Sequence, residues 1–160
     1  ISAKKVLKIL VVCTLFNLVG AALIAALFNQ SFAYTLVNSK SFLVGVVQTK
    51  LAKTSSQIFF DSIIANIFVN IAILSYLLVK DQTAKTILVI SAIFMFVFMN
   101  AEHLVANFSS FLLMGFNSVH LDGYNLANVL RHWGISFIGN WIGGGILIGA
   151  AYAFLNKKED

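Results

Sequence analysis

Charged residues and cysteine are scarce in this sequence. Only 11% of its 160 residues are charged, and its single cysteine, Cys13, lies inside an apolar run. A soluble domain carries about 25% charged residues, so a fold covered by water is excluded. One cysteine also excludes a disulfide framework and a cysteine-based zinc site. The basic residues are scattered rather than gathered on one face, which excludes nucleic acid as a partner.

Apolar residues take the place of charge. They make up 59% of the chain, and the mean hydropathy is +0.90. Because a bilayer core needs about 20 apolar residues per helix, the sequence predicts one transmembrane domain of four crossings. The predicted spans are residues 6–28, 58–79, 86–116 and 135–155. The first is longer than the apolar region of a secretory signal, which has about 7–15 residues, so we interpret it as a span.

The third crossing is interrupted. Residues 86–99 and 108–116 are apolar, but the segment between them, 100–107, contains Asn100, Glu102, His103 and Asn107. Neither apolar half is long enough to span the bilayer alone. The pattern predicts one crossing made of two half-helices around an irregular link at about residues 100–107.

The Lys and Arg residues predict the orientation. Seven fall on the side of the termini: Lys4, Lys5, Lys8, Lys80, Lys85, Lys157 and Lys158. Four fall on the other side: Lys40, Lys50, Lys53 and Arg131. The positive-inside rule therefore predicts that both termini are cytoplasmic.

A short internal repeat predicts the architecture. Residues 16–24 and 139–147 share the order Asn, apolar, apolar, Gly, small, small, apolar, apolar. Equivalent helices three crossings apart point in opposite directions, as in inverted-repeat transporters. We therefore expect an all-α membrane protein with an inverted-repeat helical bundle and a broken pore-lining helix. Since the chain begins at Ile1 and holds only the last helix of its first repeat, we expect two further N-terminal spans in the complete unit.

Two ionisable residues, Glu102 and His103, lie at the break. A charged residue at the centre of a membrane helix costs about 2.5–3.5 kcal/mol, and irregular backbone is tolerated there only beside protein or a water-filled cavity. One interpretation is a pore-lining loop whose histidine exchanges a proton, since an unperturbed histidine titrates near about pH 6.5. The alternative is a buried His–Glu pair inside a bundle.

Other polar and small residues have simpler interpretations. Asn66 and Asn140 can bridge helices through hydrogen bonds. Lys50 and Lys53 can mark the membrane interface by extending their ammonium groups into water. Glycines at small-xxx-small spacing let helix backbones approach closely, and those expected to pack helices are Gly20, Gly139, Gly143 and Gly144. Nothing in the sequence distinguishes His120 or His132.

Two motifs resemble one family. Residues 96–108, Phe-Val-Phe-Met-Asn-Ala-Glu-His-Leu-Val-Ala-Asn-Phe, resemble the Phe…Glu-His-x-Val-Ala-Asn stretch of the formate/nitrite transporter family. Residues 139–145, Gly-Asn-Trp-Ile-Gly-Gly-Gly, resemble its last-helix Gly-Asn-x-x-Gly-Gly signature. The first span, with Asn17 and Gly20, is similar to the family's third helix. The resemblance covers the whole chain but only the second part of the family's six-helix unit.

The resemblance implies an aquaporin-like fold and a homo-oligomer, a pentamer in which each protomer has its own pore. It implies that His103 faces the pore midpoint, that Phe96 forms a constriction, and that Lys50, rather than Lys53, attracts anions in an outer vestibule. The implied polar residues of the path are Glu102, Asn66, Asn107 and Asn140. It also implies a bacterial plasma membrane location, with no enzymatic activity, cofactor or metal.

Two departures from the family are visible. Asn100 and Ala101 stand where the family often has glycine, and the family's second-helix loop with its pore threonine is absent. The implied function is a channel or carrier for formate, nitrite or hydrosulfide, which passes either as the neutral acid after protonation near His103 or as the bare anion.

Two other functions remain as alternatives. An ammonium- or water-type channel is one of them. A structural subunit of a membrane complex is the other, and it would use His103 to bind haem or a metal. The absence of histidine pairs at i, i+3 or i, i+4 spacing disfavours this second alternative.

Overall fold

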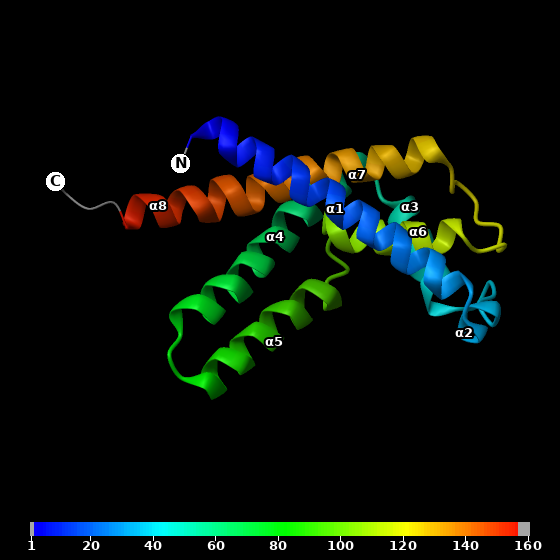
Figure 1. Cartoon of the computed structure of the whole chain (residues 1–160), viewed down its shortest axis with the longest axis horizontal. Coiled ribbons are helices and arrows are strands. Elements are labelled where there is room, and N and C mark those ends of the chain that lie inside the picture. The colour runs from blue at the N-terminus through cyan, green and yellow to red at the C-terminus, as the bar shows by residue number, and fades with distance from the viewer. Residues whose placement is uncertain (1, 157–160) are drawn as a thin grey trace. The chain divides into compact units, whose positions relative to one another are not determined.

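The computed structural model describes residues 2–156, and every regular element within them is a helix. Figure 1 follows these elements along the chain. In order, they are α1 (Ala3–Asn29), α2 (Phe32–Thr35), α3 (Phe42–Ala52), α4 (Ser55–Leu78), α5 (Gln82–Phe98), α6 (Leu104–Gly115), α7 (Leu126–Asn140), the π-helix η1 (Trp141–Ala150) and α8 (Ala151–Leu155). Lys157 and Lys158, which contribute to the predicted orientation, lie outside the described residues.

The described residues form two compact units. Unit 1 comprises residues 2–52 and 105–131, and unit 2 comprises residues 53–104 and 132–156. Three helical stretches are long and apolar enough to cross a membrane, namely Lys4–Asn29, Ser55–Leu78 and Leu126–Leu155. The helices α3, α5 and α6 are apolar but shorter.

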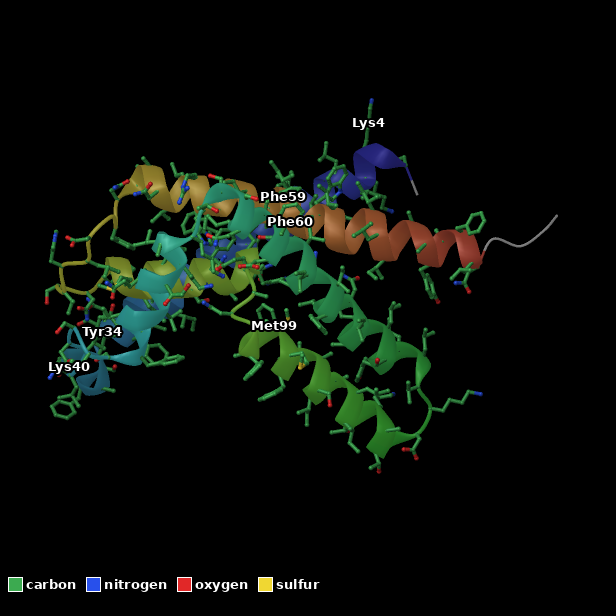
Figure 2. The ribbon with its side chains drawn as sticks, turned by 180° about the vertical axis from the view of Figure 1, so that it is seen from behind. Lys4, Tyr34, Lys40, Phe59, Phe60 and Met99 are labelled. Carbon is green, nitrogen blue, oxygen red and sulfur yellow. The ribbon has the colours of Figure 1, made fainter. Side chains whose placement is uncertain are left out.

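In unit 1, α1 is a long apolar helix with large side chains exposed along its length, such as Leu15, Phe16 and Leu23. Figure 2 shows Lys4 near the start of α1 and Lys40 beyond its other end. The Tyr34 hydroxyl of α2 donates a hydrogen bond to the Leu113 carbonyl of α6. Burial raises the pKa of Tyr34, which favours the protonated hydroxyl that this bond needs. The connection after α1 is thus fastened to α6.

In unit 2, α4 packs against both α5 and η1. The helices α4 and α5 lie side by side and are joined by a short turn (Figure 1). Each begins at a side-chain cap that satisfies a free helix-start amide. Thr54 and Gln57 form a capping box at α4, and the Asp81 carboxylate accepts from the Ala84 N–H at 2.7 Å.

Glycine permits the close approach of the last helix to α4. A Cβ atom at Gly139 would lie 2.6 Å from the Ser62 Cβ, and one at Gly144 would lie 2.6 Å from the Asn66 Nδ2. At Gly143 an added Cβ would overlap the Ile63 carbonyl oxygen. Gly20 has open space around it within the structure. Three of the four expected packing glycines therefore lie where a side chain would collide with α4.

The break in the third crossing is narrower than the sequence indicates. The helix α5 ends at Phe98 and α6 begins at Leu104, so the link comprises residues 99–103. Met99, labelled in Figure 2, directly follows α5. Asn107 is therefore on a helix, and the first amide of that helix, Leu104 N–H, donates to the Asn140 Oδ1 at 2.8 Å. This side-chain acceptor supports a helix start four residues earlier than we expected.

Two other boundaries differ from the expectation. The last helical stretch begins at Leu126 rather than residue 135, because the Asn125 side chain caps it by accepting from the Asn128 N–H at 2.9 Å. Arg131 and His132 lower the local hydropathy, so a prediction based on hydropathy misses this extension. The helix α3 was not predicted, since its 11 residues are too few for a span.

Candidate functional site

The link between α5 and α6 is fixed by a lysine from a distant part of unit 2. Lys53, directly before the capped start of α4, donates from Nζ to the Asn100 carbonyl oxygen at 2.7 Å. The same Nζ lies 2.7 Å from the Glu102 Oε1 and 2.7 Å from the Asp61 Oδ2. An ammonium group has three donors, and these three acceptors match that number. The side chain of Lys53 is only 13% exposed.

Glu102 receives a second contact on its other oxygen. Its side chain is 0% exposed, and its Oε2 lies 3.5 Å from the Nε2 of His132 on α7. His132 is also 0% exposed, and its Nδ1 lies 3.5 Å from the Ser136 hydroxyl. The carboxylate is thus held between the lysine before α4 and the histidine of α7.

Asn140 joins three segments of unit 2 through one side-chain amide. Its Nδ2 donates to the Ser62 carbonyl of α4 at 2.7 Å and to the Glu102 carbonyl of the link at 2.9 Å. Its Oδ1 accepts from the Leu104 N–H. These contacts satisfy backbone groups at the place where the helix is broken, as irregular backbone at membrane depth requires.

Asn66 reaches the same region from α4. Its Nδ2 donates to the backbone carbonyl of Asn140, the residue directly before η1. A side chain bonded to a helix carbonyl is a recognised cause of irregular helix geometry, and π-helical segments occur frequently at functional sites. Asn140 therefore bonds the backbone of the link, and Asn66 bonds the backbone of the helix that carries Asn140.

The link presents His103 next to this hydrogen-bonded cluster. Asn100 adopts a left-handed conformation with φ 49°, which asparagine tolerates better than most residues. Within unit 2, His103 is half-buried, and its ring lies edge to face with Phe96, with 6.0 Å between ring centroids. An imidazole with an aromatic neighbour and partial exposure can bind or release a proton.

The remaining expected path residues belong to unit 1. Lys50 is on α3 and is 6% exposed, and Asn107 is a buried residue of α6. Of the residues that the sequence singled out, unit 2 therefore brings together Phe96, Glu102, His103, Asn66 and Asn140.

Lys53, Asp61 and His132 are site residues that sequence reasoning missed. Lys53 was interpreted as an interface residue and His132 as unremarkable. Lys53 directly follows the end of α3, where a cation is favoured by the helix dipole, so no signal in the sequence indicated that it has carboxylate partners. His132 carried no such signal either. Within residues 2–156, no group of three or more His, Cys, Asp or Glu side chains is arranged to hold a metal ion.

The broken apolar helix and its supporting cluster define a class, an α-helical membrane protein. The chain superposes on a solved structure described as an FNT family ion channel, with a TM-score of 0.85 and 27% identity. The match covers 98% of this chain and 62% of that one. The all-α fold class predicted from the sequence is thereby confirmed.

The family model described as formate/nitrite transporter matches residues 1–154, and the chain belongs to the formate/nitrite transporter family. The resemblance seen in the sequence is confirmed. The nitrite transporter NirC of Salmonella typhimurium is 27% identical over 145 residues, covering 90% of this chain and 53% of NirC. The uncharacterized transporter YwcJ of Bacillus subtilis is 27% identical over 143 residues, covering 89% of this chain and 56% of YwcJ.

The chain spans about half the length of the curated relatives it matches. The relatives it matches are described as transporters, and the matching solved structure is described as an ion channel.

Proposed function

We propose that the protein is a membrane channel for small monovalent weak-acid anions, namely nitrite, formate or hydrosulfide. The observation that carries the proposal is His103, an ionisable side chain at the break of an apolar helix, beside the aromatic ring of Phe96. Family membership and the similarity to NirC support an anion of this kind.

The physical problem for such an anion is dehydration. A charge that leaves water for a narrow apolar constriction, to which we assign Phe96, loses hydration at a large cost unless it is paired. Desolvation favours the protonated form of a weak acid, so a proton supplied near His103 would let the neutral acid cross. We assign Lys50 to the vestibule, where a positive charge raises the local anion concentration.

The proposal gives Asn66, Asn107, Asn140 and Glu102 supporting roles on the path. The side-chain amide of Asn140 already bonds backbone groups. We therefore assign it to stabilising the link beside the path rather than to binding the anion. Asn66 in turn bonds the backbone carbonyl of Asn140. Asn107, buried on α6, is assigned to the polar lining that follows the break.

The assembly and location are part of the same proposal. We expect a homopentamer in a bacterial plasma membrane with both termini cytoplasmic. Large exposed apolar side chains on α1 and α5, such as Phe16 and Phe98, support contact with lipid or with other copies. The excess of lysine on the side of the termini supports the orientation.

A substrate panel tests the function. Proteoliposomes are loaded with a pH-sensitive dye, and nitrite, formate, hydrosulfide or ammonium is added outside. The proposal predicts internal acidification that follows uptake of the weak acids, with no comparable signal from ammonium. Alkalinisation by ammonium alone, above that of protein-free liposomes, would instead assign an ammonium channel. Silence with every solute would refute uptake of the acid together with a proton.

A further inference from the structure

Two side chains approach the carboxylate of Glu102 from different sides. Lys53 approaches Oε1 at 2.7 Å, and His132 approaches Oε2 at 3.5 Å. The two residues come from separate parts of unit 2, the segment before α4 and the helix α7. The peptide group of Glu102 is held too, because its carbonyl accepts from the Asn140 amide at 2.9 Å. Both the side chain and the backbone of Glu102 are thus restrained.

His103 follows Glu102 directly and has no comparable restraint of its own among the contacts described for unit 2. Its described neighbour is the Phe96 ring, 6.0 Å away between centroids. The direction of its side chain therefore depends on the backbone of the link, which Lys53 bonds at the Asn100 carbonyl and restrains through the Glu102 side chain. Positioning matters because proton transfer requires heavy atoms within about 2.6–3.2 Å.

The described charged neighbours of this contact come from the start of α4 and from α7. Lys53 is shared between Glu102 and Asp61 on α4, and His132 faces Glu102 from α7. Arg131 precedes His132 in the sequence. Removing one partner from a buried, hydrogen-bonded pair leaves the other charge uncompensated, which perturbs the structure more than loss of an exposed pair does.

We propose that Lys53 and His132 are positioning residues for His103, which hold the Glu102 carboxylate from two sides and thereby fix the link that presents His103 to the permeating anion. This inference rests on the proposed role of His103 in transport. Neither Lys53 nor His132 needs to touch the anion. Lys53 then fixes the position of the link, whereas anion attraction at the vestibule is the role assigned to Lys50.

The transport test measures anion flux against pH for Lys53→Met and for His132→Gln in proteoliposomes. Matched controls are Lys80→Met, at an exposed lysine, and His120→Gln, whose side chain is 92% exposed. We expect each site variant to lose flux and to displace the pH midpoint, with the smaller change for His132→Gln because its contact is longer. The controls should keep both. A normal pH profile in both site variants would overturn the proposal.

The same substitutions in a His103→Asn protein distinguish positioning of His103 from a general loss of structure. In His103→Asn protein, the additional change Lys53→Met or His132→Gln should alter flux little, because residues that act through a third lose their effect when it is replaced. Equal losses with and without His103 would show that the two residues act independently of it and would contradict the inference.

A stability cycle tests the contact between Lys53 and Glu102 without a transport measurement. Lys53→Met removes the ammonium group that Glu102 and Asp61 share, so the double variant Lys53→Met/Glu102→Gln should melt at a higher temperature than Lys53→Met alone. A lower melting temperature for the double variant would refute a stabilising contact between Lys53 and Glu102. If the wild-type protein carries no anion, the proposed function fails, and this cycle still tests the contact itself.

Discussion

Replacing Asn140 by alanine removes the side chain that joins α4, the link and α6. Asn140 is 7% exposed and makes three hydrogen bonds to backbone groups, the Ser62 and Glu102 carbonyls and the Leu104 amide. A typical hydrogen bond contributes about 1 kcal/mol net, and a buried group left unpaired costs about 1–3 kcal/mol. The expected loss for Asn140→Ala is therefore about 3 kcal/mol of unfolding free energy.

Chemical unfolding in mild detergent measures this loss. Asn156→Ala is the matched control, because the Asn156 Nδ2 bonds the Tyr152 carbonyl at an exposed position at 2.8 Å, and surface changes usually stay within about 0.5 kcal/mol. Asn140→Asp is the informative third variant. Its carboxylate can still accept from Leu104 N–H but cannot donate to the two carbonyls. A cost below about 1 kcal/mol for Asn140→Ala would refute the three-bond account.

Three further outcomes are expected. Lys50→Ala should slow anion uptake most at low ionic strength, where electrostatic steering is least screened. The loss of flux in Lys53→Met should not depend on salt. Equal salt dependence in the two variants would mean that both lysines act only as general surface charge. Gly143→Val should destabilise the protein by about 1–3 kcal/mol, because the added Cβ meets Ile63 backbone, while Gly45→Ala, which has open space, should not. Cross-linking in mild detergent should give a ladder above the dimer, and a clean monomer would contradict the oligomer.

The long apolar runs made part of this fold predictable. The spans over α1 and α4 follow from about 20 apolar residues each, and the break was visible because polar residues interrupt an apolar crossing. The helix α3 was missed because its 11 residues are too few for a span. The start of the last helix was misplaced because its first two turns include Asn128, Arg131 and His132, whose polarity lowers the local hydropathy.

The cluster around the break could be predicted only in part. The sequence marked Glu102 and His103 because they are ionisable where such groups are costly, and it marked Asn140 through a motif. The contacts of Glu102 with Lys53 and His132 join residues 49 and 30 positions apart, and no periodicity relates positions so far apart. The interpretation of Lys53 as an interface residue overlooked that its ammonium group has three acceptors inside unit 2.

The pH dependence of anion flux in His103 variants tests the central proposal most directly. His103→Phe removes both the capacity to hydrogen-bond and the titratable proton, and His103→Asn keeps the capacity to hydrogen-bond without a proton to give. Flux of nitrite or formate into proteoliposomes is measured across pH, and size-exclusion chromatography confirms that each variant assembles. The account predicts that Phe changes the flux and that Asn flattens or displaces the pH profile. Unchanged flux in assembled His103→Phe protein would show that the permeation path does not pass His103.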